Sequence, residues 1–393
     1  MIKILIGGDV CPRGRNESLF KDSKLDDIYN DLLLEFKEAD LSLINLECPL
    51  TDIKNPIPKS GPILGVPAEC IKGISGAEID IVNLANNHIL DHGYQGLKNT
   101  IEVCKKHGIG VVGAGASLES AGEMLIKEIN GLRIGILGMA EHEFSIATER
   151  SWGANPLSIT NFIKVVRKNK DNIDFLITLV HAGASGYPYP SPRFQELARF
   201  FTEEGANVVV FQQSHAPGCY EECRGSFIFY GQGNFIFDSR KKTKPTSWNE
   251  GYLIKINIDE KINSSMEIIP YVQSDVKAGA RRMDKDMERK FLEELKIKSQ
   301  KIKEKEFVQK EWEKYCENVS DSYYFFIFFG KNKLLNNKYT RFINRKLRLT
   351  KFLLSGSHKL LLKNLFSCET HREIIETSIK KELYNQDKKD KYK

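Results

Sequence analysis

Short runs of consecutive apolar residues that end abruptly in polar ones constrain the fold of this chain most. Runs such as FLITLV (Phe175–Val180) and VVVF (Val208–Phe211) lack the alternation of a strand with one face in water. Strands of this kind are covered on both faces of their sheet. Helical patterns such as Tyr94–His107 and Pro192–Glu204 separate them. Strands that alternate with helices predict an α/β layered domain over roughly the first 260 residues.

The composition changes near Asp275 to charged helical repeats, and lysines crowd the end of the chain, as in Lys380–Lys393. We therefore expect two parts, an α/β domain over residues 1–274 and a basic, mostly helical appendage over residues 275–393. The formal net charge of the 393 residues is +6. Lysine runs are usually solvated helix faces or tails. Contact with an acidic polymer or anionic lipid is the less favoured interpretation, and we expect no nucleic acid partner.

The cysteines and the apolar runs bear on the cellular location. The eight cysteines show no pairing pattern, because CYEEC (Cys219–Cys223) has no second pair to complete a zinc spacing. The opening MIKILIGGDV is typical of a strand rather than a signal peptide. The longest apolar run, Ser322–Gly330, is shorter than the ~20 residues of a membrane span. The sequence predicts no transmembrane segment and a cytoplasmic protein, and leaves peripheral membrane attachment open.

Side chains of metal-ligand or acid–base type follow five of the predicted strands, which are Ile2–Ile6, Leu41–Leu46, Ile79–Leu84, Phe175–Val180 and Val208–Phe211. In chain order, these side chains are Asp9, Glu47, Asn87 with His88 and Asp91, His181, and His215. In open α/β sheets the carboxyl ends of the strands border the ligand site. One such residue is more often a turn former. Five together indicate a site, and their mixture of oxygens and imidazoles suits one or two divalent ions of Mn, Fe or Zn.

The wording of these motifs resembles a known family. The matching stretches are GGDVCPRGR (Gly7–Arg15), LINLECPLT (Leu43–Thr51), VNLANNHILDHG (Val82–Gly93), LVHAG (Leu179–Gly183), SHAPGCYE (Ser214–Glu221) and YGQGNFIFD (Tyr230–Asp238). They resemble the CapA-like capsule (poly-γ-glutamate) synthesis proteins of the calcineurin-like metallophosphatase superfamily. The resemblance covers roughly residues 1–260. It implies a four-layer α/β/β/α sandwich with a two-metal centre between the sheets.

The resemblance also implies a ligand set. Asp9 and His215 would hold the first metal, and Glu47 would bridge both metals. Asn87 and His181 would hold the second. We therefore expect a site in which both sheets contribute ligands.

Further residues carry roles toward the substrate. The resemblance implies that His88, oriented by Asp91, acts as a general acid or stabilises developing charge. It makes Arg13 and Arg15 available for an anionic substrate, since guanidinium groups suit phosphate and carboxylate. Two interpretations of Lys59 stay open, because its loop either presents the ammonium to an anion or lies in solvent.

The chain departs from the family pattern at several positions. Gln212 and Gln213 stand where the family carries histidines, and Gln213 occupies the position expected to supply an imidazole to the second metal. Ser185 stands where an acid is expected. Cys11 replaces a histidine found in many metallophosphatases and is expected to pack, while Asn234 is expected to brace its loop. We predict at least one bound metal and a weakened second site.

Two functions from different classes follow. The first is a metal-dependent hydrolase acting on a phosphorylated or polyanionic cell-envelope intermediate. The second is a catalytically weak or inactive subunit that scaffolds capsule biosynthesis proteins and docks through its basic appendage. Nucleic-acid processing on the same fold rests on net charge alone and ranks last.

Overall fold

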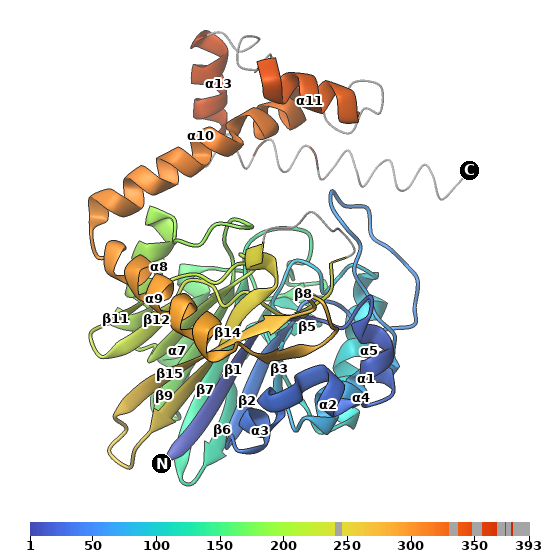
Figure 1. Ribbon diagram of the computed structural model, residues 1–393, viewed down its shortest axis with the longest axis vertical. Coiled ribbons are helices and arrows are strands. Elements are labelled where there is room, and N and C mark those ends of the chain that lie inside the picture. The colour runs from blue at the N-terminus through green and yellow to red at the C-terminus, as the bar shows by residue number, and fades with distance from the viewer. Residues whose placement is uncertain (240–245, 330–336, 348–355, 368–373, 375–378, 380–393) are drawn as a thin grey trace. The chain divides into compact units, whose positions relative to one another are not determined.

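Buried apolar strands build two β-sheets that lie face to face, with helices against both outer faces (Figure 1). The computed structural model describes residues 1–239, 246–329, 337–347, 356–367, 374 and 379. It divides into two compact units, Met1–Trp312 and Glu313–Lys393. The first unit is the predicted four-layer α/β/β/α sandwich.

The first sheet has the strand order β16-β15-β14-β1-β2-β3-β4, and β13 also pairs with β1. Strands β1 to β4 run parallel, whereas β14, β15 and β16 extend the sheet in antiparallel fashion. The bounds are β1 (Ile2–Cys11), β2 (Leu41–Leu46), β3 (Ile81–Asn83), β4 (Gly110–Val112), β13 (Asn234–Phe237), β14 (Glu250–Ile258), β15 (Ser264–Gln273) and β16 (Ala280–Arg282).

The second sheet has the order β11-β12-β10-β9-β7-β6, with parallel pairing from β12 to β7 and antiparallel edges. Its strands are β6 (Leu125–Ile129), β7 (Leu132–Ala140), β9 (Phe175–His181), β10 (Val208–Gln212), β11 (Tyr220–Cys223) and β12 (Ser226–Phe229). Two short strands, β5 (Ala114–Gly115) and β8 (Gly153–Ala154), pair apart from both sheets. The dipeptide Asn130-Gly131, which predicts a hairpin from the sequence, joins β6 to β7, and both residues have positive φ, as a tight hairpin requires.

Helices flank the sheets and form the remaining unit. Those before β7 are α1 (Asn16–Lys21), α2 (Leu25–Tyr29), η1 (Asn30–Leu32), α3 (Leu33–Lys37), η2 (Ala68–Cys70), α4 (Ile71–Gly76), α5 (Gly93–Lys106) and α6 (Leu118–Ala121). Later ones are α7 (Ile159–Asn169), α8 (Pro192–Glu203), η3 (Thr246–Trp248), α9 (Lys285–Lys301), α10 (Lys305–Phe329), α11 (Lys338–Leu347) and α13 (Gly356–Ser367).

Three buried clusters fill the spaces between the four layers. Between the sheets, Ile4 and Leu43 belong to one cluster with Ile177 and Val208. A second cluster joins the first sheet to α1–α5, and a third joins the second sheet to α7 and α8. Burial of this apolar surface is the main favourable contribution to folding. It fixes the two sheets against each other, so that side chains at their facing edges hold fixed positions.

Two sequence expectations differ from the structure. The sequence pattern over Leu25–Glu38 predicts a single helix. This prediction is wrong, because Asn30 takes a positive φ of 48° and ends α2. The predicted boundary near Ser274 does not coincide with the division between the units. The chain continues as β16 and α9, and Leu295 of α9 is buried in the inter-sheet cluster.

The second unit contains the later part of α10 together with α11 and α13. Among the helices in the described ranges, none is long and apolar enough to cross a membrane.

Candidate metal centre

A β-bulge aims Asp9 into the space between the sheets. Where β1 pairs with β2, the register shifts between Ile6 and Asp9. The extra residue moves Asp9 to the face of Ile6, away from the helix-covered face that Leu5 occupies. Gly8 allows this path, since a Cβ there would lie 2.3 Å from the carbonyl oxygen of Gly233. The backbone of β1 therefore places a carboxylate that is 1% exposed at the sheet edge.

Alternation along β2 and the end of β9 bring further ligands to the same space. Ile44 and Leu46 face the helices, so Asn45 and Glu47 face the second sheet. His181 is the last residue of β9 and is fully buried. Both sheets thus contribute side chains, as the resemblance implied.

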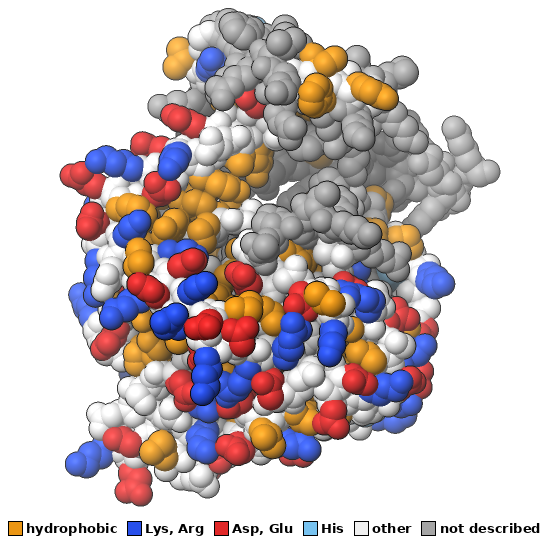
Figure 2. Space-filling model, viewed as in Figure 1, with side chains coloured by type: hydrophobic (Ala, Val, Ile, Leu, Met, Phe, Trp, Pro, Cys, Tyr) orange, Lys and Arg blue, Asp and Glu red, His pale blue; other side chains and the backbone are white. Residues whose placement is uncertain are grey.

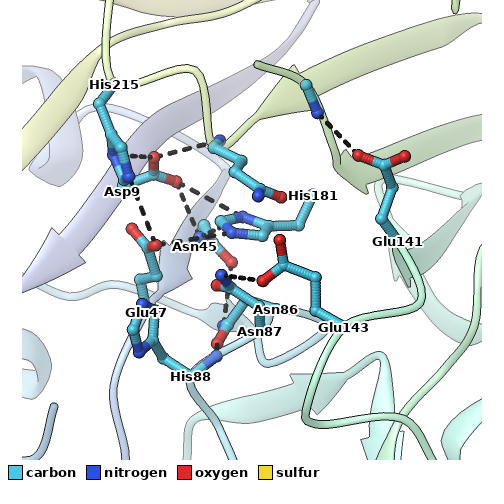
Figure 3. Close-up of polar contacts among 12 residues, drawn as sticks. Asp9, Asn45, Glu47, Asn86, Asn87, His88, Glu141, Glu143, His181 and His215 are labelled. Atoms are coloured by element: carbon cyan, nitrogen blue, oxygen red, sulfur yellow. Dashed lines mark hydrogen bonds and ion pairs between the residues drawn. The ribbon is translucent and has the colours of Figure 1, made fainter. Parts of the chain in front are cut away.

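Asp9, Glu47 and His215 form a cluster whose ligand atoms lie within 4.8 Å of one another (Figure 3). Nδ1 of His215 is 3.4 Å from Oδ2 of Asp9, and its Nε2 is 3.8 Å from Oε1 of Glu47. Two carboxylates and an imidazole at this spacing are a ligand set that Mn²⁺, Fe²⁺ or Zn²⁺ accepts.

His181 and Asn87 lie on the other side of Glu47. Nε2 of His181 is 3.6 Å from Oε1 of Glu47. Asn87 donates from Nδ2 to Oε2 of Glu143 at 2.6 Å. Among the described residues, no hydrogen-bond partner exists for three buried atoms here: Glu47 Oε2, Asn87 Oδ1 and His181 Nε2. Buried polar atoms rarely stay unpaired, and all three are atoms that can coordinate a cation. The residues therefore fit a divalent metal.

Mutual charge holds this cluster in an ionised state. Burial opposes the charged form of Glu47, but the neighbouring imidazoles of His215 and His181 lower its pKa to about 2. Burial likewise opposes a charged His215, but the carboxylates of Glu47 and Asp9 raise its pKa to about 9. The ionised carboxylates of the site therefore favour a positive charge between them.

Asn234 orients His215. Its Nδ2 donates to the carbonyl of Trp248 at 3.2 Å, so its Oδ1 is free to accept from Nδ1 of His215 at 2.9 Å. The proton on Nδ1 leaves the lone pair of Nε2 toward Glu47, which is the arrangement that metal-ligating histidines use. The expectation that Asn234 braces its loop is confirmed by these contacts.

Asn45 is a contact residue that the sequence interpretation missed. Its Nδ2 donates to Oδ1 of Asp9 at 2.8 Å and lies 3.2 Å from Nδ1 of His181. Its Oδ1 accepts from Asn83 at 3.2 Å and from Asn86 at 3.4 Å. The signal was present, because Asn45 stands two residues before Glu47 and shares its face of the strand. Cys11, by contrast, is buried in the helix-side core, as expected.

The loop after β10 has a strained backbone at Gln213 and His215. Gln213 and His215 have positive φ values of 83° and 54°. Such conformations are costly in non-glycine residues and cluster at functional sites. The backbone N–H of Gln213 donates to Oδ2 of Asp9 at 3.2 Å. Gln212 is 2% exposed and donates to the carbonyl of Gly7 at 3.2 Å, so it bridges the two sheets.

His88, Asp91 and Lys59 form a buried triad beside the cluster. Oδ2 of Asp91 lies 2.6 Å from Nδ1 of His88, and Oδ1 lies 2.6 Å from Nζ of Lys59. A lysine ammonium only donates and a carboxylate only accepts, so Nδ1 of His88 carries the proton toward Asp91. The Lys59 side chain is 1% exposed, and the interpretation of a solvated Lys59 is therefore wrong.

The two arginines differ in their partners. Arg15 forms a two-pronged ion pair with Asp238, at 3.0 Å from both Nε and Nη2, and also donates to the carbonyl of Ser274 at 2.7 Å. The prediction that Arg15 is available for a substrate is therefore corrected, because its guanidinium ties β13 to the chain after β15. Among the described residues, none forms a hydrogen bond or ion pair with the Arg13 side chain.

Comparison with known proteins agrees with the motifs. A family model described as "Bacterial capsule synthesis protein PGA_cap" matches residues 3–239. Capsule biosynthesis protein CapA from Bacillus anthracis is 28% identical over 214 residues, which are 53% of this chain and 51% of that protein. PGA biosynthesis protein CapA from Bacillus subtilis (strain 168) is 27% identical over 267 residues, or 67% and 69% of the two chains. This chain thus spans about half the length of the B. anthracis relative.

Among solved structures, the calcineurin-like phosphoesterase YfkN from Bacillus subtilis superposes with a TM-score of 0.43 at 13% identity, over 68% of this chain and 90% of that chain. The family match is the stronger finding, because it covers more than half of the sequence. The chain belongs to the family of bacterial capsule synthesis proteins described as PGA_cap.

Proposed function

We propose that this protein is a metal-dependent hydrolase that acts on a phosphorylated or polyanionic cell-envelope intermediate. The observation that carries the proposal is the buried cluster of Asp9, Glu47 and His215, with Nε2 of His181 3.6 Å from Oε1 of Glu47. Among the described residues, Glu47, Asn87 and His181 each have a buried polar atom without a hydrogen-bond partner. Asp9, Glu47 and His215 would hold one divalent cation, and Glu47, Asn87 and His181 a second. Such a cation polarises the group under attack and offsets the charge that develops on it.

The triad beside the cluster supplies proton transfer. Because Nδ1–H of His88 donates to Asp91, Nε2 is the ring nitrogen left for the substrate. Asp91 is held in turn by Lys59 and by the backbone N–H of Leu64 at 2.6 Å. This support fixes the plane of the imidazole, so His88 protonates a leaving group or stabilises its charge without first reorienting.

The substrate class follows from charge. The guanidinium of Arg13 would bind an anionic group of the substrate, whereas that of Arg15 is paired with Asp238. An acidic cell-envelope substrate and capsule biosynthesis proteins as partners, together with the cytoplasmic location expected from the sequence, belong to this proposal and to the family relationship that motivates it.

The test combines metal content with turnover. After dialysis against Mn²⁺ or Zn²⁺, elemental analysis measures bound metal, and a panel of aryl phosphates and phosphodiesters measures hydrolysis. We expect His88→Ala to lower kcat by about 100-fold or more, while metal content and melting temperature stay unchanged. His107→Ala, on an exposed histidine, serves as the matched control. Equal loss in both variants, or wild-type turnover in His88→Ala, would contradict the assigned role.

A second candidate is a non-catalytic subunit that scaffolds a capsule-making complex. Gln213 favours it, because this position offers an amide in place of an imidazole and its N–H is already committed to Asp9. This alternative predicts capture of partner proteins through residues 275–393 and no hydrolysis with any metal. Turnover in the presence of Mn²⁺ would reject it.

A further inference from the structure

Charge is segregated between the two units of the chain. Residues 313–393 contain eighteen lysines and arginines against nine acidic residues, a net charge of +9, whereas the whole chain carries +6. Residues 1–312 therefore carry −3. Within residues 322–368 there are ten lysines and arginines and no aspartate or glutamate. Charge of one sign repels itself in a folded unit, so a dense basic segment indicates an anionic partner.

Helix α11 exposes its apolar side chains and buries a polar one. Tyr339, Phe342 and Ile343 are 78%, 53% and 44% exposed. Asn344 is 5% exposed, and its Nδ2 lies 3.4 Å from the carbonyl of Asp321 in α10. A helix of a soluble unit normally turns its apolar face inward. Within the described part of the unit, this reversed arrangement leaves the apolar side chains of α11 exposed.

Helix α13 has the same property. Leu360, Leu361 and Phe366 are 69%, 54% and 60% exposed, with exposed Lys359 next to them. Hydrophobic side chains of this unit lie at the surface in Figure 2, whereas the first unit shows positive and negative side chains interspersed. Apolar exposure on two helices in succession indicates an interaction surface rather than a single stray side chain.

The spacing in α11 fits one kind of partner. Tyr339, Phe342 and Ile343 recur at intervals of three and one, which place them on one helical face. The sequence of the same helix carries Lys338, Arg341 and Arg345 at intervals of three and four. A helix with basic residues beside aromatic and aliphatic ones is typical of segments that lie in the headgroup region of a bilayer.

We propose that α11 and α13 dock on the surface of a membrane rich in anionic phospholipid. Both halves of the surface are then used, because the cations meet lipid phosphates and the apolar side chains enter the acyl boundary. A soluble polyanion would leave Leu360, Leu361 and Phe342 in water. A single-stranded nucleic acid could stack on aromatic rings but would not cover leucines. This inference is independent of the metal centre and of its activity.

Vesicle flotation of the full-length protein tests the proposal. Vesicles of neutral phosphatidylcholine are compared with vesicles that also contain about 30 mol% phosphatidylglycerol. We expect flotation with the anionic vesicles only, and a partial loss when salt is raised from about 0.1 M to about 0.5 M. Some binding should survive the salt, because the apolar contacts are not screened.

A charge variant tests the electrostatic half. Each lysine or arginine near an anionic surface is worth about a fivefold factor in binding, so Lys338→Gln, Arg341→Gln and Arg345→Gln combined should lower partitioning about 100-fold. The matched control removes the same charge from the first unit, at exposed Lys24 and Lys105 together with Lys106, and should leave partitioning unchanged.

An apolar variant tests the other half. Phe342→Ser with Leu360→Ser should lower partitioning by about tenfold per side chain, including at high salt. The control is Leu34→Ser with Ile159→Ser, which replaces exposed apolar residues of the first unit. Circular dichroism verifies the folding of every variant.

Three results would overturn the proposal. The first is no flotation with anionic vesicles, and the second is equal flotation with neutral ones. The third is binding that the charge variant weakens and the apolar variant does not, which would assign the surface to a soluble polyanion.

Discussion

The two halves of the candidate metal centre differ in the chemistry of their ligands. One half has the carboxylates of Asp9 and Glu47 with His215, and its ligand atoms lie within 4.8 Å of one another. The other half shares Glu47 but adds the amide of Asn87 and the imidazole of His181. Where the resemblance implies a further imidazole, this chain has Gln213.

This difference predicts that the two halves of the centre bind a divalent metal with different affinities. Carboxylates supply charge that a divalent cation needs, whereas amide oxygens are neutral and weaker ligands. The half with Asp9 and His215 should therefore fill first, and the half with Asn87 should need a higher metal concentration. Changes at single ligands test which half of the centre binds metal first.

The largest effect is expected for Glu47→Gln. Oε1 of Glu47 lies 3.6 Å from Nε2 of His181 and 3.8 Å from Nε2 of His215, so one carboxylate serves both halves. Removing a direct charged ligand should lower affinity for both equivalents of Mn²⁺ by more than about 100-fold, which exceeds the effect of outer-shell changes. Isothermal titration calorimetry measures it, with exposed Glu69→Gln as control. One tight equivalent left in the variant would show that the halves do not share Glu47.

Gln213→His should act on the weaker half alone. An added imidazole should raise the affinity for the second equivalent of Mn²⁺ by about 10–100-fold and raise turnover with it. The control is Gln300→His, which adds a histidine on exposed surface. An unchanged second affinity would mean that the backbone geometry of the loop, with its positive φ at Gln213, is unsuited to ligation.

The half with His215 should give the metal-free protein a bell-shaped stability profile. The pKa of Glu47 is lowered from 4.5 to about 2, so its contribution is present above pH 4.5 and is lost as pH falls toward 2. The pKa of His215 is raised from 6.5 to about 9, so its contribution is present below pH 6.5 and is lost as pH rises through 9. Both slopes belong to one ion pair, worth on the order of 2 kcal/mol.

Urea unfolding in the presence of a chelator, repeated across pH, measures this profile. Added Mn²⁺ should flatten the alkaline slope, because a metal-ligating histidine is neutral. Glu47→Gln should reduce the alkaline slope, since Asp9 is then the remaining carboxylate that raises the pKa of His215. An alkaline slope that is unchanged in this variant would assign it to another group.

The sequence predicted the ends of β2, β9 and β10 to within one residue, but β1 ends at Cys11 and not at Ile6, so that Asp9 lies inside the strand. The apolar run before Glu47 ends where β2 ends, at Leu46, and the run before His181 ends one residue early. Continuous apolar character requires a sheet covered on both faces. Polar side chains at the carboxyl ends of its strands then lie together at one edge. The polar residues that gather at this edge were therefore within reach of the sequence, whereas their role as metal ligands stays a prediction.

Contacts between residues far apart in the chain could not be predicted from the sequence. The bulge that turns Asp9 inward depends on pairing with a strand some thirty residues away, and periodicity within β1 shows none of it. The ion pair of Arg15 joins residues 223 positions apart. Lys59 reaches Asp91 across a loop whose composition is that of exposed chain. Burial and pairing of such groups are set by tertiary structure.

Strand β15 was missed for a local reason. Pro270 lies within it, and a proline argues against a strand interior. The structure tolerates this proline because β16 pairs only with Tyr271–Gln273, so its absent N–H faces the open end of that neighbour. The carbonyl of Pro270 accepts from the N–H of Met283 just beyond β16.

The smallest effect is expected for Asn234→Ala, and it again separates the halves. Without the acceptor at 2.9 Å, Nδ1 of His215 loses the partner that holds its proton, so Nε2 no longer faces Glu47 in a fixed tautomer. Affinity for the first equivalent of Mn²⁺ should fall about tenfold, while the second is unchanged. Asn234→Asp keeps an acceptor and should restore binding. Equal losses in both variants would show that Asn234 acts through the hydrogen bond from its Nδ2 to the carbonyl of Trp248, which both variants remove, rather than by orienting the imidazole.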